Sequence, residues 1–209
     1  MFKTQLIFRE RIGFMKKIFA VVLAAFVLAA LVLACEKKEE EIGEDTDTKA
    51  ALQSIMDAAG AAAGDDVFIP MTFDGEVSKD NSEDKLGLAP EQFEDHAIDA
   101  CYMTAAIGTQ AFEVTLVKCK NYDSAKEVKS LAAKGYNPQK WICVFPEQCF
   151  VIDSGRFVLL GAVYDNTAEI FQNAFKEQFE TAAGETNKFY ERGADEPEGG
   201  GFGGGLILE

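Results

Sequence analysis

Histidine is almost missing from this chain of 209 residues, whose single histidine is His96. A metal site built on imidazole needs several ligands, and a Ser-His-Asp triad needs a histidine beside its serine. His96 follows Glu94 and Asp95 at the end of a short expected helix, where a polar surface role is typical. No serine lies in a GxSxG motif. We therefore expect no catalytic residue of these kinds, no metal and no cofactor.

Closely paired cysteines of the CxxC type are also absent. Their absence argues against a thioredoxin-like redox site and against a zinc knuckle. Apart from Cys35, an even number of cysteines remains, which in an exported domain is typical of disulfides and allows three pairings. The candidate disulfide partners are Cys101, Cys119, Cys143 and Cys149. The alternative is that they are free and buried, because cysteine packs as a small hydrophobic residue.

Positive charge is scarce. The whole chain has 20 Lys and Arg against 35 Asp and Glu, a formal net charge of −15. Cleavage before Cys35 would remove five basic residues and one acid, leaving 15 against 34 and a net charge of −19. Such a field repels phosphate backbones and anionic lipid headgroups. We therefore expect no nucleic-acid partner and no electrostatic attachment to a membrane.

One long apolar run is present, residues 18–34, which follows Lys16 and Lys17 and ends directly at Cys35. A basic segment, an apolar segment and small residues at the cleavage point are typical of a secretory signal peptide. The sequence VLAC at its end resembles the bacterial lipobox. The resemblance implies that residues 1–34 are removed and that the Cys35 thiol carries a diacylglycerol. Acyl chains hold a protein on a membrane because each buried CH₂ contributes about 0.8 kcal/mol.

Two other interpretations of the apolar run stay open. With 17 residues it is at the lower limit of a membrane-spanning helix, so one alternative is an uncleaved anchor. The other is a buried core helix. The lipoprotein and the uncleaved anchor both place the rest of the chain on the extracytoplasmic face of the cell membrane. Translation from either Met1 or Met15 is compatible with export.

Composition divides the remaining chain into a tether, a domain and a tail. Residues 35–47 are expected to be a lipidated cysteine and a charged spacer, because 36–47 contain one aliphatic residue and cannot form a core. Residues 48–183 have the length of a single domain. Residues 184–209 are acidic and then glycine-rich, which predicts a flexible tail. A phosphate-binding loop is not expected there, because such loops lie between a strand and a helix.

Hydrophobic periodicity predicts an α+β domain. Helices are expected over 48–63, from Pro90, over 124–134, and from Asn166 or Thr167 onward. Two hairpins are expected, with strands over 98–106, 111–119, 148–153 and 156–164. Residues 67–72 are predicted to form a short extended segment, and residues 73–88 are predicted to form a loop. We therefore predict an antiparallel sheet of about four strands with helices packed mainly on one face.

Two clusters are candidates for binding. The loop residues Asp74, Asp80, Asn81 and Asp84 offer oxygen ligands, but the spacing is not that of an EF-hand, so a solvated loop is the simpler interpretation. Aromatic residues gather around Trp141, which predicts either core packing or a patch for a ligand or partner. They are Tyr136, Trp141, Phe145 and Phe150.

The stretches KLGLAPEQFEDHAI, AFEVTLVKCKNYDSAKEVKSLAAK and VIDSGRFVLLGAVYDNTAEIFQNAFKEQF resemble the bacterial lipoprotein family catalogued as domain of unknown function 4358. The resemblance covers roughly residues 48–180. It implies a lipobox, a charged spacer and one small α+β domain. The family has no assigned activity, so no catalytic residue is carried over to this chain.

The sequence thus predicts a membrane-anchored lipoprotein that is not an enzyme. Its expected partners are the membrane, through the lipid, and an envelope protein or extracellular ligand. The competing hypothesis is an envelope enzyme that uses paired carboxylates, for which Asp99 and Glu113 on neighbouring strands are the candidates. A shallow apolar patch would favour the binding module, whereas a pocket holding two perturbed carboxylates would favour the enzyme.

Overall fold

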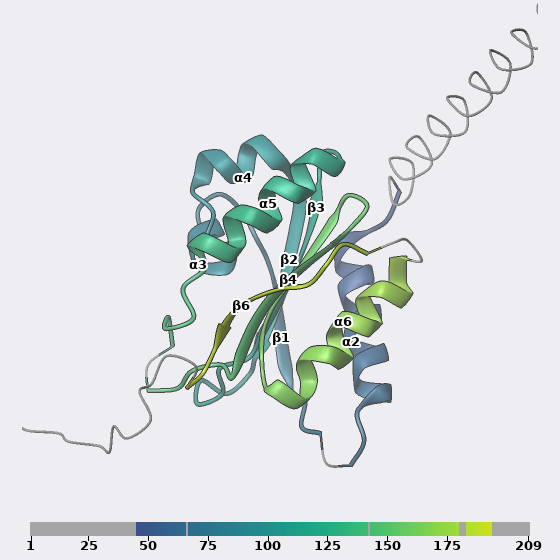
Figure 1. Ribbon diagram of the computed structural model, residues 1–209, viewed down its shortest axis with the longest axis vertical. Helices are drawn as coiled ribbons and strands as arrows, with labels where there is room; N and C mark the ends of the chain where they lie inside the picture. The colour runs from purple at the N-terminus through teal and green to yellow at the C-terminus, as the bar shows by residue number, and fades with distance from the viewer. Residues whose placement is uncertain (1–44, 66, 142, 180–182, 194–209) are drawn as a thin grey trace, which may run out of the picture. The chain divides into compact units, whose positions relative to one another are not determined.

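The computed structural model describes residues 45–65, 67–141, 143–179 and 183–193, arranged as Figure 1 shows. These residues form five helices and six strands, so the predicted α+β class is confirmed. In chain order the elements are α2 (Thr48–Ala62), β1 (Thr72–Glu76), α3 (Ser82–Leu86), α4 (Pro90–His96), β2 (Ala97–Ala105), β3 (Glu113–Cys119), α5 (Tyr122–Gly135), β4 (Gln148–Ser154), β5 (Phe157–Val163), α6 (Asp165–Phe179) and β6 (Asn187–Glu191). Among the described helices, none combines the length and hydrophobicity needed to span a bilayer. The predicted signal segment, 1–34, lies outside the described residues.

The strands form one antiparallel sheet in the order β1-β2-β3-β5-β4-β6. Both predicted hairpins, β2–β3 and β4–β5, are present at its centre. The turn between β4 and β5 contains Gly155 with φ +57°, a conformation that glycine adopts without steric cost. The prediction of about four strands is therefore only roughly right, because each edge carries one more strand.

The two edge strands lie largely where the sequence predicted loop or tail. β1 shares only Thr72 with the predicted extended segment 67–72 and otherwise occupies residues expected to be a loop, whereas β6 occupies part of the expected flexible tail. β6 pairs with β4, and Phe189 packs edge-on against Tyr136 with ring centroids 6.1 Å apart. Both strands have five residues and are mostly exposed, so neither shows the alternation of a half-buried strand.

Helices cover both faces of the sheet, which corrects the prediction of one covered face. α2 and α6 lie against one face, and α3, α4 and α5 lie against the other (Figure 1). The reason is visible in β4 and β5, in which every residue is buried. A strand that is apolar on both sides needs cover on both sides, and the run FVLLGAV is such a strand.

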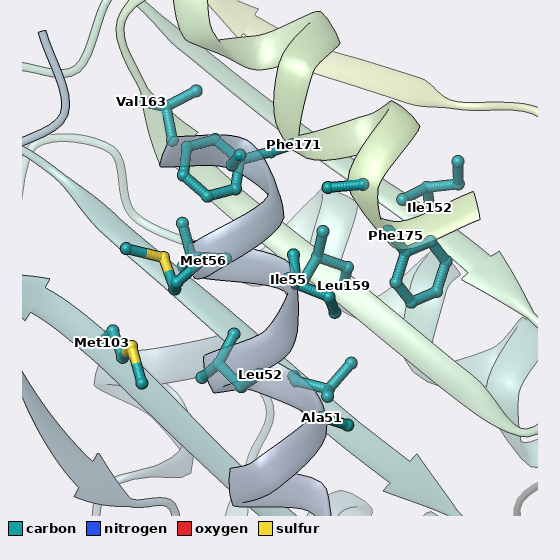
Figure 2. Close-up of a cluster of buried hydrophobic side chains, with 14 of the residues drawn as sticks. Ala51, Leu52, Ile55, Met56, Met103, Ile152, Leu159, Val163, Phe171 and Phe175 are labelled. Carbon is teal, nitrogen blue, oxygen red and sulfur yellow. The ribbon is translucent and has the colours of Figure 1, made fainter. Parts of the chain in front are cut away.

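The core beneath α2 and α6 is the larger and more aromatic of the two. Leu52 and Ile55 of α2 meet Phe171 and Phe175 of α6 above Leu159 of β5 (Figure 2). Apolar residues of α2 recur at intervals of three and four, so one face of the helix is buried. This recurrence is why the sequence predicts the helix well.

The second core is formed by smaller side chains. Ala125, Val128 and Ala132 of α5 pack on Val117 and Leu160 of the sheet. Small residues on this face let α5 approach the sheet closely. The result is three layers, with the sheet between two sets of helices.

α2 begins at the expected residue, Thr48, and α5 begins earlier than expected. Asp47 caps α2 by accepting a hydrogen bond from the Ala50 amide at 2.7 Å. Asn121 caps α5 by accepting from the Ser124 amide at 2.8 Å, so α5 begins two residues before the predicted Ser124. Asp and Asn are as good N-caps as Ser and better than Thr, so several candidates stood close together in the sequence.

Gly161 provides a test of the larger core. It lies opposite Phe150 in the β4–β5 ladder, and a Cβ on Gly161 would overlap the buried Phe150 ring. We expect Gly161→Ala to lower the free energy of unfolding by about 1–3 kcal/mol, because the ring has to move within a packed core. Urea unfolding measures the change.

Gly108→Ala is the matched control, because no atom lies within 4 Å of a Cβ at that position in the β2–β3 loop. Its effect should stay within about 0.5 kcal/mol. Equal effects of the two substitutions would contradict the packing described for Phe150.

Candidate functional site

The four domain cysteines are free thiols. Cys101 faces the core under α2 and α6, whereas Cys119 and Cys149 face the core under α5. Cys119 lies beside Arg156 and Cys149 beside Ala162, so six residues of β5 separate them, roughly 20 Å. The fold therefore brings no two of these buried thiols together. The structure supports the alternative of free cysteines over the candidate disulfides, while Cys35 lies outside the described residues.

The other candidates from the sequence are dispersed. His96 ends α4, and its carbonyl accepts a hydrogen bond from the Lys120 amide at 2.9 Å. The supposed ligand loop is divided between β1, which holds Asp74, and α3, which holds Asp84. Within the described ranges, no three His, Cys, Asp or Glu side chains are grouped so as to hold a metal ion.

Asp99 and Glu113 do not form a catalytic pair. The register places Glu113 opposite Thr104, five residues along β2 from Asp99, which is roughly 17 Å. Side chains alternate along a strand, so Glu113 lies on the α5 face and Asp99 on the α2 face. Asp99 is exposed and Glu113 is buried. The two candidates therefore lie in different environments on opposite faces of the sheet.

Glu113 is the centre of a buried charge network. Its carboxylate, 1% exposed, accepts hydrogen bonds from Lys85 Nζ at 2.8 Å and from Lys140 Nζ at 2.6 Å. The Tyr136 hydroxyl donates a longer bond to it at 3.4 Å. Asp84 adds a second negative charge, 2.9 Å from Lys85 and 3.7 Å from Lys140. Two carboxylates and two ammonium groups thus balance each other beneath α3 and α5.

The pKa values within this network shift in different directions. Burial lowers the pKa of Lys140, and the charges of Glu113 and Asp84 oppose this only in part. Burial also acts to lower the pKa of Lys85. The charges of Glu113 and of Asp84, which lies closer to Lys85 than to Lys140, outweigh the effect of burial and raise the pKa. Lys140 instead lies over the rings of Tyr136 and Trp141, at 4.8 and 5.0 Å from their centroids. Burial, and then the charge of Glu113, raises the pKa of Tyr136 well above its usual value.

The network connects three segments that are distant in the sequence: β3, α3 and the chain after α5. Its carboxylate oxygens are already occupied by lysines of the same chain, and its side chains line neither of the two grooves described below. The geometry therefore fits a role in fixing α3 and residues 136–141 to the sheet. Sequence reasoning missed it, because no spacing pattern connects residues 85, 113 and 140.

Two surface grooves are present on the described part of the chain. One, of about 550 Å³, lies between α5 and the β6 segment and contains Lys126, Lys129 and Lys134. Lys129 is already neutralised by Asp153 at 2.6 Å. The other, of about 470 Å³, is lined by Phe68 and Tyr164 together with acidic residues before and after β4 and β5.

Exposed hydrophobic side chains gather at one end of the sheet, where β1 begins and the β2–β3 hairpin turns. Phe68 is 55% exposed, Met71 76%, Phe73 64% and Ile107 55%. The Ala106 amide donates to the Met71 carbonyl at 2.8 Å, which places Ile107 beside Met71. We call these four residues the apolar end. Phe145 of the aromatic cluster is also exposed at this end of the sheet, whereas Tyr136 and Phe150 belong to the cores.

The chain enters the domain at the opposite end. Lys118, near the end of β3, donates a hydrogen bond to the Thr46 carbonyl at 3.0 Å, just before α2 begins. Lys118 pairs with Asp99 on β2, and the apolar end lies beyond Ala105 of the same strand. Six residues of β2 separate the two positions, roughly 20 Å.

Removing the charge at Glu113 tests the buried network. We expect Glu113→Gln to lower the free energy of unfolding by about 3–5 kcal/mol, because two buried ammonium groups lose their main counter-charge. Urea unfolding measures it. Adding Lys140→Met should recover part of the loss, since one ammonium is then removed with its partner. Asp99→Asn is the exposed control, and strict additivity of the two network substitutions would contradict the coupling.

Thiol reactivity tests the placement of the cysteines. Burial raises the pKa of Cys101, Cys119 and Cys149 to about 12 in each case. At mildly alkaline pH these three are protonated and enclosed, whereas Cys143 is exposed. Alkylation of the native protein followed by peptide mapping should label Cys143 first, and the other three only after unfolding. A disulfide in the mapped peptides would contradict the free thiols.

The comparisons with known proteins give no match. Neither the protein-family models, nor the curated proteins, nor the solved structures include one that matches this chain. The resemblance to domain of unknown function 4358 therefore stays a prediction, and function is argued below from the geometry alone.

Proposed function

We propose that this chain is a lipid-anchored lipoprotein of the bacterial cell envelope whose domain binds another protein and catalyses no reaction. The support for the anchor is in the sequence: the apolar run 18–34 and the lipobox-like VLAC that ends at Cys35. The charged segment 36–47 then serves as a spacer between the membrane surface and the domain.

The apolar end is the single observation that carries the binding role. Scattered exposed hydrophobic residues are ordinary, but here four large ones gather at one end of the sheet. Phe68 also lines the smaller groove, where its ring centroid lies 6.3 Å from that of Tyr164. Such a surface is typical of contact with another protein.

Position and charge favour a protein over the membrane as the occupant of this surface. The apolar end lies at the far end of the sheet from Thr46, the side from which the spacer joins the domain. The formal net charge of −15 opposes insertion among anionic headgroups. The apolar end is therefore separated along the sheet from the point at which the chain enters the domain, and the charge favours a protein partner.

The alternative of an enzyme with paired carboxylates loses its support. Asp99 and Glu113 lie on opposite faces of the sheet, and Glu113 is held by Lys85 and Lys140. No observation in the described residues favours another catalytic arrangement, so we propose no second function.

Site-specific photo-crosslinking in native cells tests the proposal. A photoreactive residue at Met71 should give a discrete adduct in the membrane fraction, because Met71 is the most exposed residue of the apolar end. The same residue at Glu127, on the exposed side of α5, is the control and should give none. Intact mass of the adduct should show a chain that begins at Cys35 and carries acyl chains.

Three results would count against the proposal. A mass that retains residues 1–34 without lipid would overturn the anchor. Adducts only with lipid would show that the apolar end enters the membrane. Adducts that persist unchanged when Phe73 and Ile107 are both replaced by serine would show that the apolar end is not the binding surface.

A further inference from the structure

β1 forms an open edge of the sheet beside the apolar end. In an antiparallel pair, the residues of a strand alternate between pointing their N–H and C=O groups at the partner and pointing them away. Hydrogen bonds from Ala106 to the Met71 carbonyl, 2.8 Å, and from Val77 to the Ala100 carbonyl, 2.9 Å, set this alternation. The backbone groups of Thr72, Asp74 and Glu76 therefore point outward, where no described strand lies. Of these groups, the Glu76 carbonyl accepts a hydrogen bond from the Asn81 side chain at 3.0 Å.

The two faces of this edge differ in chemistry. Side chains alternate along β1, so Met71 and Phe73 lie on the α5 side. Asp74 and Glu76 lie on the α2 side, where Lys49 pairs with Asp74 at 2.5 Å across an exposed surface. An incoming strand would therefore meet hydrophobic side chains on one face and acidic ones on the other.

In natural proteins, an edge strand is usually protected from pairing with another chain by a covering loop, a bulge or dense charge. The pairing of β1 with β2 runs through all five residues without a bulge. Gly75 keeps the strand close to the sheet, since a Cβ there would lie 2.5 Å from the Tyr102 ring. β1 therefore pairs regularly with β2, and its outward backbone groups other than the Glu76 carbonyl are open, although the strand is short and carries Asp74 and Glu76.

We propose that β1 accepts an extended segment of a partner protein as an additional strand, and that this segment alternates hydrophobic with basic residues. Its hydrophobic side chains pack on Met71 and Phe73, and its Lys or Arg side chains pair with Glu76 and compete with Lys49 for Asp74. Cross-strand pairs of these kinds stabilise neighbouring strands. Backbone hydrogen bonds give affinity in this mode of recognition, and the alternation gives specificity. The inference rests on the proposed binding function and names its partner.

Charge argues against a second copy of this chain as the occupant. In the fully overlapped antiparallel pairing of two β1 strands, Asp74 faces Asp74 of the other copy. Two chains with a net charge of −15 also repel each other over longer distances. A basic segment gains from the same field that disfavours self-association.

Four synthetic peptides of about eight residues, a length that covers a strand such as β1, separate the contributions. The first alternates valine and lysine. The second has the same composition with valines and lysines in separate blocks, and the third alternates valine and glutamate. The fourth is the first peptide with N-methyl groups on the residues whose amides would face β1. Titration against the full-length protein gives the affinities, and amide exchange reports on Thr72, Asp74 and Glu76.

Two variants locate the site. Thr72→Pro removes an outward amide at the first residue of β1, where proline is compatible with a strand and no hydrogen bond to β2 is lost. Phe73→Ser removes the exposed ring. We expect each to weaken binding of the valine–lysine peptide by about tenfold or more. We also expect slowed exchange at Thr72, Asp74 and Glu76 in the wild-type complex.

The outcomes separate this inference from the proposed function. Equal binding of the alternating, block and N-methylated peptides, or binding unaffected by Thr72→Pro, would overturn strand addition and leave the apolar end as a binding surface. Dimers of the protein that Thr72→Pro dissociates would make a second copy the occupant and overturn it too. Should Thr72→Pro fail to fold, the N-methylated peptide decides the question alone.

Discussion

The two-sided burial of the central strands is the constraint on which the rest of this structure depends. β4 and β5 are buried at every residue, and β3 at all but one, so the sheet requires a layer on each face. α2 and α6 supply one layer from the two ends of the domain sequence. α5 supplies most of the other. The three-layer arrangement follows from this requirement, because an apolar strand left open on one side would expose its side chains to water.

The buried charges hold α3 and residues 136–141 in place on the sheet. α3 is one short helix, and residues 136–141 form irregular chain. Their main apolar contributions to the core on this face are Leu86, Tyr136 and Trp141. Glu113 holds both through Lys85 and Lys140, and the two lysines are held in turn near Asp84. A buried ion network contributes little net free energy when compared with a hydrophobic substitute. Its geometry does, however, specify where these segments lie.

The two ends of the sheet present different surfaces. The end of the sheet near Thr46 receives the chain from the predicted spacer, and the opposite end carries exposed hydrophobic residues and the open edge of β1. The net charge of the whole chain favours a basic partner.

The sequence by itself determined the α+β class, the two central hairpins and the amphipathic helices, because each depends on the spacing of hydrophobic residues within one short segment. It could not determine β1 and β6, since five exposed residues acquire a strand conformation only by pairing with a neighbour that is already in place. The same holds for the site. Glu113 looked like one of several surface carboxylates until the fold brought Lys85 and Lys140 to it. Phe68, Met71 and Phe73 are close in the sequence, but the position of Ile107 beside Met71 was decided by tertiary structure, because proximity between separate segments is set by sheet register and not by local pattern.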